Sequence, residues 1–410
     1  MTEASTRAPV LIAGGGMGGL ATALALTRQG TPVHLLEQTQ AFSEVGAGIQ
    51  LGPNVVRILH HWGLQSALQQ VAAWPQQLLS RDAITGEVLG RLPLGQAITQ
   101  RYGAPYATIH RADLHQLLLD AVRSHGLAQL QLQSVLQTFE QDSERVRVRC
   151  TLKDSVEQGL SAPALVGADG LWSRVRTQLL NDQPPRATGH VAYRVLVPQK
   201  MLPFALRSQD VTVWMGANMH AVQYPVSAGA WLNMVVLVDA SPPTDILGWD
   251  LQQPPETVAR DLYKALRGAC SPLQELVRHV EGWRVWSLCE RGIVQGAHHM
   301  AQGRVALLGD AAHPMLPYLA QGAGMAIEDA QALSSAWAET SWSVPQRLQH
   351  YAQTRWRRNA RVQRRAVRNG HIFHSTGLTR LGRDLSLRLL GARLMDIPWL
   401  YGGQSSAGKP

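Results

Sequence analysis

A cluster of glycines near the start of the chain constrains the fold more than any other feature. Residues 9 to 38 read PVLIAGGGMGGLATALALTRQGTPVHLLEQ. An apolar run leads into the glycines, a helical pattern follows, and a second apolar run ends on an acid. This order predicts a strand, a tight turn, a helix and a second strand. Such an arrangement is typical of a dinucleotide site located at the turn.

Each glycine of the GxGxxG pattern has its own physical reason. Gly14 permits the tight turn, Gly16 lets a pyrophosphate approach the backbone, and Gly19 lets the helix pack on the strand. The helix N-terminus offers unpaired N–H groups and a partial positive charge to the phosphates. Glu37 ends the second strand, 18 residues after Gly19, where its carboxylate can accept from ribose hydroxyls. An acid there disfavours the 2′-phosphate of NADP, which leaves FAD and NAD.

The composition is that of a globular protein with more than one domain. The chain has 410 residues, of which 45% are hydrophobic and 16% charged. Its three cysteines are widely spaced, which is typical of a reducing cytoplasm, and no Cys or His spacing indicates a metal site. The apolar stretch from 10 to 26 contains five glycines and lacks a basic flank, so we expect neither a signal peptide nor a membrane span.

The net charge is +9, and much of the excess lies in RWRRNARVQRRAVR, residues 355 to 368. We favour a solvated helix face for this segment. Two alternatives stay open: a surface that contacts nucleic acid or a membrane, and a positive field that attracts anionic substrates and reduced nicotinamide. The arginines are spread around the expected helix and are not lined up with interleaved aromatic residues, which disfavours nucleic acid.

The expected pattern of secondary structure changes twice along the chain. Residues 52–72 and the segment IHRADLHQLLLDAVRSHG have helical spacing, whereas LQLQSVLQTFEQDSERVRVRCTL alternates as strands do. Between about 186 and 290, the segments VAYRVLVP, DVTVWMGANMHAVQYPV and AWLNMVVLV predict strands of one sheet. Strand and helix alternate again from 304, a helix begins at about 322, and the tail after 345 is mostly helical. We therefore predict an α/β nucleotide-binding domain made of 1–75, 100–185 and 290–345. It is interrupted by a β-sheet substrate domain, 76–99 and 186–289, and followed by a helical region, 346–410.

Two later segments decide between the dinucleotides. They are VGADGLWSRVR, 166 to 176, and GRVALLGDAAHPMLPYLAQGAGMAIEDA, 303 to 330. A simple NAD dehydrogenase needs no second strand that ends on an acid beside glycines. Here VALLGD ends at Asp310, whose carboxylate can accept from a ribityl chain. AQGAG then opens a helix, and its N-terminus suits a flavin edge that becomes negative on reduction. FAD is therefore the expected cofactor, and with no second GxGxxG a nicotinamide cofactor has no Rossmann domain of its own.

The order and spacing of these three motifs resemble the single-component FAD-dependent aromatic hydroxylases, which are built like p-hydroxybenzoate hydroxylase. The resemblance covers residues 8 to about 340. Within the family, GAGIQLGPN, IHRADLH, GADGLWSRVR, GHVAYRVLVP and WLYGG look most like the branch of 3-hydroxybenzoate 6-hydroxylases and salicylate hydroxylases. The resemblance implies a Rossmann-like FAD-binding domain interrupted by a β-sheet substrate domain, with a helical C-terminal region.

The resemblance also implies a set of cofactor contacts. The early glycine turn would hold the ADP half of FAD, the GD motif would meet the riboflavin half, and the GADG segment would meet both FAD and reduced nicotinamide. Arg111 has an independent reason, because a guanidinium at the start of a helix can clamp a pyrophosphate; the alternative is an ion pair with Asp113 or Glu37. The expected cofactor-binding residues are Gly14, Gly16, Gly18, Gly19, Glu37, Gln38, Gln50, Arg111, Leu136, Asp169, Asp310, Ala320, Gln321, Gly322, Ala323 and Gly324.

By resemblance, the reaction is hydroxylation of a small phenolic acid with O₂ and NAD(P)H, through a flavin C4a-hydroperoxide. Conversion of 3-hydroxybenzoate to gentisate is favoured, followed by salicylate to catechol, and the branch favours NADH over NADPH. Alternatives are a hydroxypyridine such as 6-hydroxynicotinate, a quinone precursor, a larger aromatic ring, or a flavin-binding regulator with a basic helix. The expected partners are the substrate, O₂ and NAD(P)H, without nucleic acid or stable membrane association. A homodimer through the helical tail is one option.

A phenol reacts best as phenolate, yet a free phenol has a pKa of about 10, so the site needs a base near the hydroxyl. In NMHAVQYPV, residues 218 to 226, strand alternation puts His220, Val222 and Tyr224 on one face. The branch it resembles has a histidine and a tyrosine at this spacing. We expect His220 to act as the base and Tyr224 to orient the ring or its carboxylate. The alternative is a satisfied core histidine beside a core tyrosine.

The segment PMLPYLAQGAG is expected to lie beside the ring that is oxidised, and it departs from the branch. The 3-hydroxybenzoate 6-hydroxylases are expected to have a glutamine before the tyrosine, whereas Pro317 precedes Tyr318 here. The related 6-hydroxynicotinate hydroxylases have a Pro–His pair at this place. We expect Pro317 and Tyr318 to shape the pocket, and Gln321 to offer an amide to the substrate.

Overall fold

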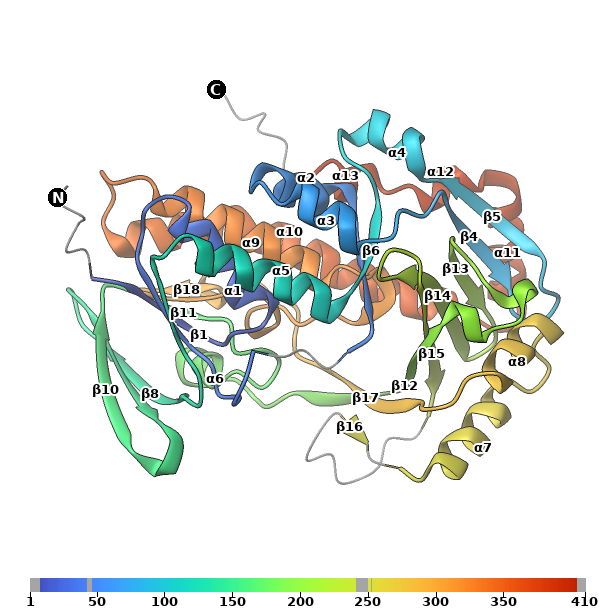
Figure 1. The fold of residues 1–410 in the computed structure, drawn as a ribbon, viewed down its shortest axis with the longest axis horizontal. Coiled ribbons are helices and arrows are strands. Elements are labelled where there is room, and N and C mark those ends of the chain that lie inside the picture. The colour runs from blue at the N-terminus through green and yellow to red at the C-terminus, as the bar shows by residue number, and fades with distance from the viewer. Residues whose placement is uncertain (1–7, 43–45, 241–249, 252, 404–410) are drawn as a thin grey trace.

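The glycine-rich start of the chain folds into the predicted βαβ unit (Figure 1). The structure, a computed structural model, describes residues 8–42, 46–240, 250–251 and 253–403. Strand β1 (Val10–Ala13) leads into α1 (Met17–Thr27) and then β2 (Val33–Leu36), and the two strands pair in parallel. All four residues of each strand are buried, as the continuous apolar runs predict for a parallel sheet.

The first sheet brings the three sequence motifs together. Its strand order is β18-β19-β11-β1-β2-β7. Strands β11 and β19, which end in the GADG and GD motifs, pair in parallel with β1 and with each other. Their carboxyl ends therefore meet at one edge, where ligands of open α/β sheets bind. The other strands of this sheet are β7 (Ala128–Gln131), β11 (Leu165–Gly167), β18 (Ala301–Gln302) and β19 (Val305–Leu307).

The second sheet has the order β16-β17-β12-β15-β14-β13-β4-β5. Two of its strands come from residues 76–99 and the rest from 186–290, which supports the division into domains that we propose from the sequence. Its strands are β4 (Gln77–Asp82), β5 (Val88–Pro93), β12 (Arg186–Pro198), β13 (Val211–Met215), β14 (Met219–Val226), β15 (Trp231–Asp239), β16 (Asp250–Leu251) and β17 (Arg284–Glu290).

Two helices in this region were not predicted. They are α7 (Pro255–Ala265) and α8 (Ser271–Arg278), and both begin with a proline in the first turn. Leu262 and Leu273 are fully buried in one cluster with apolar side chains of β12 and β15. The helices therefore cover a face of the second sheet that strands alone would leave exposed.

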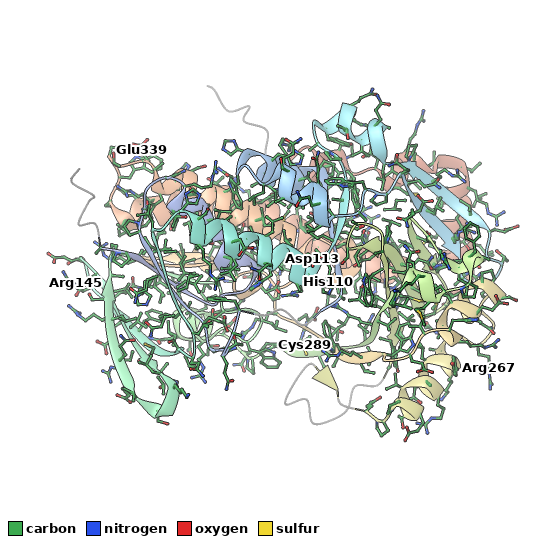
Figure 2. All side chains as sticks on the ribbon, in the orientation of Figure 1. His110, Asp113, Arg145, Arg267, Cys289 and Glu339 are labelled. Atoms are coloured by element: carbon green, nitrogen blue, oxygen red, sulfur yellow. The ribbon has the colours of Figure 1, made fainter. Side chains whose placement is uncertain are left out.

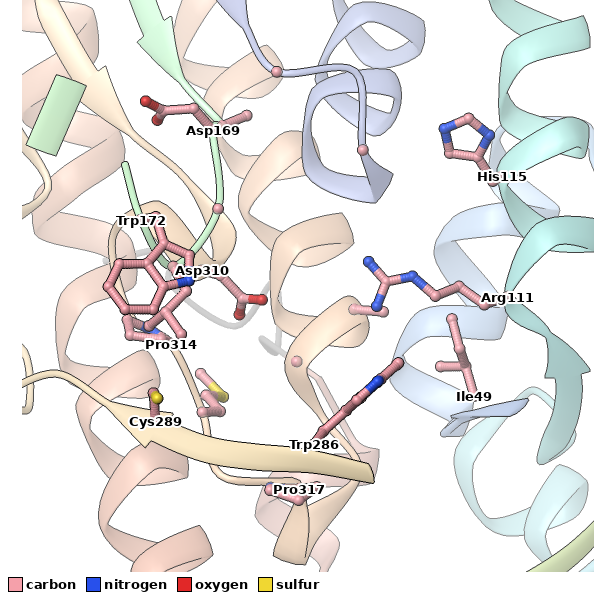
Figure 3. A pocket seen from close by; sticks show the side chains of 18 of the residues that line it. Ile49, Arg111, His115, Asp169, Trp172, Trp286, Cys289, Asp310, Pro314 and Pro317 are labelled. Atoms are coloured by element: carbon pink, nitrogen blue, oxygen red, sulfur yellow. The ribbon is translucent and has the colours of Figure 1, made fainter. Parts of the chain in front are cut away.

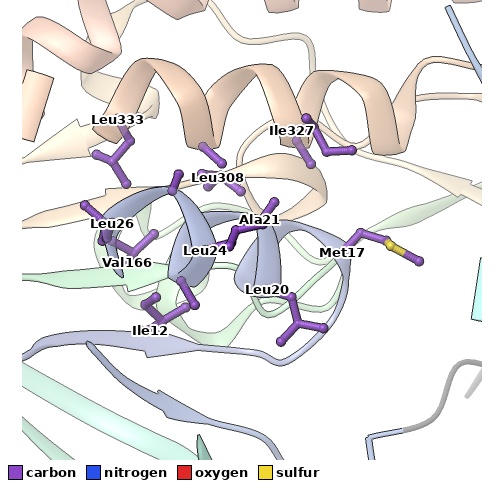
Figure 4. Close-up of a cluster of buried hydrophobic side chains, with 14 of the residues drawn as sticks. Ile12, Met17, Leu20, Ala21, Leu24, Leu26, Val166, Leu308, Ile327 and Leu333 are labelled. Carbon is purple, nitrogen blue, oxygen red and sulfur yellow. The ribbon is translucent and has the colours of Figure 1, made fainter. Parts of the chain in front are cut away.

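Helices α1 and α9 (Gly322–Trp337) form the centre of the nucleotide-binding core (Figure 4). Leu24 and Ile327 are fully buried where the helices meet. Gly18 of α1 is closely packed: a Cβ there would lie 2.8 Å from Cδ2 of Leu308, which follows β19, and 3.6 Å from Cβ of Ala326 on α9. Burial of each leucine or isoleucine contributes about 1.5–3 kcal/mol. The contact between α1 and α9 is therefore a main source of stability for the sheet edge where the three sequence motifs meet.

The remaining elements surround these two sheets. Residues 52–72 form two short helices, because a turn at Gly63 (φ +83°) divides the predicted helical stretch. The described residues contain no helix that is long and apolar enough to cross a membrane. The elements are β3 (Gly48–Leu51) paired with β6 (Ala107–His110), the meander β8 (Val135–Gln141), β9 (Val146–Thr151) and β10 (Glu157–Ala162), and the helices α2 (Pro53–His61), α3 (Gln65–Val71), α4 (Gly95–Tyr102), α5 (Arg111–Ser124), α6 (Arg174–Leu180), α10 (Val344–Phe373), α11 (Gly377–Leu390), α12 (Ala392–Met395) and α13 (Pro398–Tyr401).

The basic segment 355–368 lies on α10, and its expected role as a solvated helix face is wrong at two positions. Arg355 is 1% exposed and its guanidinium binds the carboxylates of Asp329 and Glu328 on α9. Arg358 makes two further hydrogen bonds to Glu328. Arg355 is buried and Arg358 is partly buried. Each is paired and hydrogen-bonded, which lowers the cost of removing a charge from water.

Candidate active site

A cavity of about 920 Å³ lies between the two sheets (Figure 3). One part of its wall comes from the glycine turn after β1, and another from β14, β15 and β17 of the second sheet. Figure 2 shows His110, Asp113 and Cys289 near the middle of the molecule, whereas Arg145 and Arg267 lie at its outer edges. The cavity thus spans the boundary between the nucleotide-binding part and the inserted sheet.

The glycine turn forms one end of the cavity. Gly14 has a φ of +103°, and a Cβ there would lie 2.4 Å from the carbonyl oxygen of Ala168. Only glycine fits this turn, as predicted. Helix α1 follows with Gly16 at its N-cap, without a side-chain cap and without an acid in its first turn. Its N-terminal positive end is therefore directed at the cavity without a neutralising carboxylate of its own first turn.

Asp310 and the start of α9 form the middle of the cavity. Helix α9 begins after Gln321, also without a side-chain cap, and its first residues Gly322 and Ala323 line the wall. The preceding Ala320 has a φ of +51°, a left-handed conformation that costs a non-glycine residue free energy. That strained residue lies in the cavity wall, where it turns the chain into the helix start.

Most of the expected cofactor-binding residues face the cavity. Those that line it are Gly14, Gly16, Glu37, Gln38, Gln50, Arg111, Leu136, Asp169, Asp310, Ala320, Gln321, Gly322 and Ala323. Three expected glycines do not line it. Gly18 packs on Leu308, a Cβ on Gly19 would lie 1.8 Å from the carbonyl oxygen of Gly14, and a Cβ on Gly324 would lie 2.8 Å from Val55. These three act through close packing of helices and turn.

Two of the acids have additional partners inside the protein. Glu37 accepts hydrogen bonds from the backbone N–H groups of Gly15 (2.6 Å) and Thr39 (2.8 Å). Asp169 accepts from the Ser173 hydroxyl (2.6 Å) and from the backbone of Arg174 (2.8 Å), at the start of α6. Asp169 therefore holds the GADG turn to its helix in addition to facing the cavity.

The side chain of Arg111 points into the cavity from the start of α5 (Figure 3). Asp113, one of the two ion-pair partners considered for Arg111, accepts a hydrogen bond from Ser227 at 3.0 Å and lies 3.8 Å from His110. The direction of the Arg111 side chain suits the pyrophosphate clamp expected from the sequence.

The described residues fit FAD. Two uncapped helix N-termini supply N–H donors and positive potential for phosphates and for a flavin edge. Glu37 and Asp310 supply acceptors for hydroxyl groups, and the Gly14 turn lets a phosphate approach the backbone. These residues, together with Arg111, would hold the cofactor along the wall from β1 to α9.

The inserted sheet forms the other end of the cavity. His220, Val222 and Tyr224 of β14 all line it, on the one face that alternation predicts. Tyr224 donates a hydrogen bond to the carbonyl oxygen of Gly48 (2.7 Å), and burial raises its pKa. A Cβ on Gly48 would lie 2.5 Å from the Tyr224 ring, so the ring is held closely against β3.

His220 is 1% exposed and has a defined set of partners. Its Nδ1 lies 2.7 Å from Nε2 of His374, the residue that ends α10. Nδ1 of His374 lies 2.5 Å from Oδ1 of Asp239 at the end of β15. Burial lowers the pKa of His220 well below its usual value, and His374 and His190 lower it further. The imidazole is therefore neutral at neutral pH, with Nε2 left for a ligand.

The segment around Pro317 divides between cavity and core. Pro317 and Gln321 line the cavity, as expected. Tyr318 does not line it. Its hydroxyl is hydrogen-bonded to Nδ1 of His190, and its ring is 4% exposed beside the rings of His220 and His374. Its role in the pocket wall is therefore corrected to a contact behind His220.

Sequence reasoning missed Arg194 of β12. Its side chain lines the cavity, and its guanidinium carbon lies 4.1 Å from the ring centre of Trp286. Its Nε is buried without a hydrogen-bond partner, and in the described ranges no carboxylate forms an ion pair with it. Burial lowers its pKa to about 10, against the opposing effect of Tyr224. The signal was present as a single arginine in an apolar strand, VAYRVLVP.

An array of charges behind the cavity was also missed. His313 of the GDAAHP segment binds the buried carboxylate of Asp329. The same carboxylate accepts from Arg355 (2.6 Å) and Asn359 (3.0 Å). It joins the GD loop to α9 and α10, so it fixes the middle of the cavity from behind. The fold and the cavity together fit a flavoprotein, and the end of the cavity formed by the inserted sheet carries a histidine, a tyrosine and an arginine.

Comparison with known proteins places the chain in a family. The family model described as "FAD binding domain" matches residues 7–366. The chain is 37% identical to a 3-hydroxybenzoate 6-hydroxylase of Polaromonas naphthalenivorans, with 98% of each chain covered. It is 37% identical to a 3-amino-4-hydroxybenzoate 2-monooxygenase of Streptomyces platensis, with 99% of each covered. Among solved structures, Klebsiella pneumoniae HpxO complexed with FAD and uric acid has a TM-score of 0.81 at 25% identity, with 94% of each chain covered.

The chain therefore belongs to the FAD binding domain family. It is an FAD-dependent aromatic hydroxylase, as the three motifs predicted. The fold prediction is confirmed as well, including the interrupting sheet and the C-terminal helices.

Proposed function

We propose that this enzyme hydroxylates a small aromatic acid that carries a phenolic hydroxyl, with 3-hydroxybenzoate as the favoured substrate and gentisate as the product. One observation carries the proposal: a neutral histidine, His220, and a partly buried arginine, Arg194, line the same cavity from one sheet. A histidine can take the proton of a hydroxyl, and an arginine can bind a carboxylate. The two groups define a substrate with both functions.

Strand register supports a common direction of these side chains. Val235 of β15 pairs with Arg194 on one side and with Val222 on the other. Leu237 pairs likewise with Ala192 and with His220. Residues opposite each other on neighbouring strands point to the same face, and so do residues two apart on one strand. Arg194 and His220 therefore both point toward the cavity, with the apolar side chains of Val222, Val235 and Leu237 between them.

Arg194 suits a carboxylate because its Nε is buried without a hydrogen-bond partner beside Trp286. A guanidinium in an apolar wall gains from a negatively charged ligand, since charge-assisted hydrogen bonds are strong where water is excluded. The ring of Trp286 stabilises the cation and holds its plane. The carboxylate of an aromatic acid would form the ion pair with Arg194 that no carboxylate among the described residues forms.

His220 suits a hydroxyl because its imidazole is neutral and its Nδ1 is already bonded to His374. The remaining nitrogen, Nε2, accepts the hydroxyl proton, which makes the ring electron-rich. Tyr224 is held by Gly48 at the same end of the cavity and orients the ring. Bound FAD, once reduced by NAD(P)H, supplies the activation of O₂, and the apolar wall excludes water from that reaction. We propose NADH as the reductant, as in the branch that the sequence resembles.

Salicylate and 6-hydroxynicotinate are the second candidates, because each also carries a hydroxyl and a carboxylate on one ring. Pro317 in the cavity wall specifically favours 6-hydroxynicotinate as an alternative substrate, since the hydroxylases of that substrate also have a proline at this place. The three acids differ in the type of ring and in the spacing of the hydroxyl and the carboxylate, and these differences determine which acid fits between His220 and Arg194.

The test is O₂ uptake by the yellow holoenzyme with NADH and each of the three acids, with identification of the product. The proposal expects strong stimulation by 3-hydroxybenzoate with formation of gentisate, and a large loss of hydroxylation in His220→Ala. Catechol from salicylate, or a hydroxylated pyridine, would move the assignment to a second candidate. No stimulation by any hydroxylated aromatic acid would refute it. With NADPH in place of NADH, a higher rate would overturn the choice of reductant.

A homodimer remains a proposal as well. Leu378, Leu381, Leu385 and Leu389 on α11 are each more than half exposed and recur at helical spacing, which supports pairing through the C-terminal region. Elution of the holoenzyme at the mass of one chain would refute it.

A further inference from the structure

We propose that His374 and Asp239 form a proton path that fixes His220 as a base and carries the proton of the substrate hydroxyl from the cavity to the surface. The proposal rests on the proposed function, because it needs a substrate with an acidic hydroxyl. His374 and Asp239 do not line the cavity, so both act through His220 as positioning and proton-carrying residues.

The path consists of three side chains from three elements. His220 of β14 is 1% exposed, His374 at the end of α10 is 6% exposed, and the side chain of Asp239 at the end of β15 is 41% exposed. The two hydrogen bonds that join them measure 2.7 Å and 2.5 Å. The chain of donors and acceptors thus begins in the dry cavity wall and ends at a carboxylate in contact with solvent.

The carboxylate determines which nitrogen of each imidazole carries a proton. An ionised carboxylate only accepts hydrogen bonds, so Nδ1 of His374 must be the donor to Asp239. The neutral His374 then has an unprotonated Nε2, which accepts from Nδ1 of His220. The neutral His220 in turn has an unprotonated Nε2 toward the cavity. Asp239 therefore acts through His374 on His220: it keeps the proton of His220 on Nδ1 and leaves Nε2 free to act as the base.

The proton transfer balances along this path. The hydroxyl proton passes to Nε2 of His220, and the proton on Nδ1 of His220 passes to Nε2 of His374. His374 is then an imidazolium beside the carboxylate of Asp239. It passes the proton on its Nδ1 to that carboxylate, and Asp239 transfers this proton to water. Each imidazole then carries its proton on Nε2. The starting tautomers return when the path runs in the opposite direction and delivers a proton from solvent to the bound product phenolate. One phenolate forms in the cavity and one proton reaches solvent.

The surroundings of His374 favour its neutral form at rest and allow a short-lived imidazolium during proton transfer. Burial lowers its pKa, and Asp239 opposes this effect. The other titratable or charged groups that face it are His190 of β12, Tyr318, His371 of α10 itself, and Arg383 of α11, which bonds the carbonyl oxygen of Phe373 at 3.0 Å. His190 lies 3.5 Å from Asp239 and stacks on His374 with ring centres 5.2 Å apart.

The backbone holds the three residues in register. The carbonyl oxygen of His374 accepts from the N–H of Asn218 at 3.1 Å, and the carbonyl oxygen of Asn218 accepts from the N–H of Asp239 at 3.0 Å. Asn218 has a φ of +57°, a left-handed conformation in the turn that joins β13 to β14. This turn therefore ties the end of α10 to the two strands that carry the other members of the path.

The first experiment follows proton release when oxidised holoenzyme is mixed with 3-hydroxybenzoate in weak buffer with a pH-indicator dye. Substrate binding is followed separately through the flavin absorbance. Wild type is expected to release protons in the same phase as it binds the acid. Asp239→Asn keeps size and hydrogen bonding but removes the charge, and we expect proton release slowed about 10-fold or more, with substrate binding almost unchanged.

Asp261→Asn is the matched control, because the side chains of Asp239 and Asp261 are 41% and 40% exposed. It is expected to behave as wild type. His374→Ala tests the middle of the path: added imidazole is expected to restore the rate of proton release, since it can occupy the space that the side chain leaves. Equal release in wild type and Asp239→Asn, or His374→Ala without loss, would overturn the proposal.

A second measurement separates this proposal from the proposed function. ¹⁵N-histidine labelling of the holoenzyme without substrate, with His220 assigned through His220→Gln, reports which ring nitrogen is protonated. The proposal expects an unprotonated Nε2 in wild type and a changed tautomer distribution in Asp239→Asn. A protonated Nε2 in wild type would overturn the path even if 3-hydroxybenzoate is hydroxylated. Failure of every acid to bind, with the expected tautomer present, would refute the proposed function alone.

Discussion

The Nε atom of Arg355 lies 2.6 Å from Oδ1 of Asp329, and both side chains are buried between α10 and α9. The same carboxylate binds His313 of the GD loop. Helix α9 begins at the cavity wall and α10 ends at His374. This buried pair therefore connects the cofactor end of the site with the helix that reaches the substrate end.

Asp329→Asn is expected to destabilise the protein strongly, because it leaves the charge of Arg355 buried with a weaker partner. We expect a loss of about 3–5 kcal/mol in the free energy of unfolding, measured by urea denaturation of the holoenzyme. Arg149→Ala removes an exposed pair with Glu140, whose side chains are 72% and 73% exposed, and is the control. It should cost less than about 1 kcal/mol. Similar losses in the two variants would contradict the buried-pair interpretation.

The same array predicts the pH dependence of stability. Burial alone would raise the pKa of Asp329, but His313 and Arg355 outweigh it and hold the pKa well below its usual range. Glu328 shows the same balance with Arg355 and Arg358, and its pKa is also lowered. A carboxyl with a folded pKa below its unfolded value, about 4, stabilises the fold above that value.

Stability from these two carboxylates should therefore persist from neutral pH to about 5 and fall as the pH drops below about 4. Urea midpoints between pH 3 and 7 measure this profile. In Asp329→Asn the acid decline should be shallower, because one of the two titrating groups is gone. A profile of unchanged steepness would assign the decline to other acids.

Gly14→Ala should abolish FAD binding, because its Cβ would lie 2.4 Å from the backbone of Ala168 at a φ of +103°. Gly30→Ala is a matched control: its φ is +75°, and a Cβ there meets nothing within 4 Å. It carries the conformational cost of about 1–2 kcal/mol without the clash. The flavin-to-protein ratio after purification measures the difference. Equal flavin content in both variants would show that the turn tolerates a side chain.

Arg194→Met should weaken the use of acids selectively. Loss of a charge-assisted pair worth about 1.5–3 kcal/mol corresponds to a rise in KM of about 10-fold to 100-fold for 3-hydroxybenzoate, with a smaller change in kcat. With 3-hydroxybenzamide, which lacks the carboxylate, wild type and Arg194→Met should have similar KM values. Arg186→Met, on the same strand with a side chain that is 79% exposed, is the control. An equal effect on acid and amide would remove Arg194 from carboxylate binding.

The FAD-binding part of the fold was predictable because its signals are local. The GxGxxG turn, the acid at Glu37 and the helix start after Gln321 each lie within a few residues of the groups that they affect. Strand alternation likewise predicted a common face for His220 and Tyr224. Helices α7 and α8 were missed within a β-rich stretch, although Pro255 in the first turn and apolar residues at Val258 and Leu262 gave a helical signal.

The rest of the site depends on contacts between segments far apart in the sequence. His374 lies 154 residues from His220, and nothing in its local sequence indicates that the end of α10 reaches β14. Arg355 looked like part of a solvated helix because a pattern of charges does not show which ones meet buried carboxylates. Tyr318 was expected in the pocket for a similar reason: its neighbours line the cavity, but its own side chain turns the other way, toward His190.

Helix α10 contacts the site at several points along its length. Arg355 binds the α9 carboxylates, Gln363 bonds the carbonyl oxygen of Pro314 at 3.0 Å, Asn369 bonds that of Tyr318 at 3.0 Å, and His374 meets His220. One helix thus contacts both the segment that we expect to hold the cofactor and the histidine that we expect to meet the substrate. If His220 binds the substrate as we propose, substitutions near the last turn of α10 are expected to change which ring is oxidised while the yellow colour of the protein persists, so activity in such a chain can diverge without loss of the flavin.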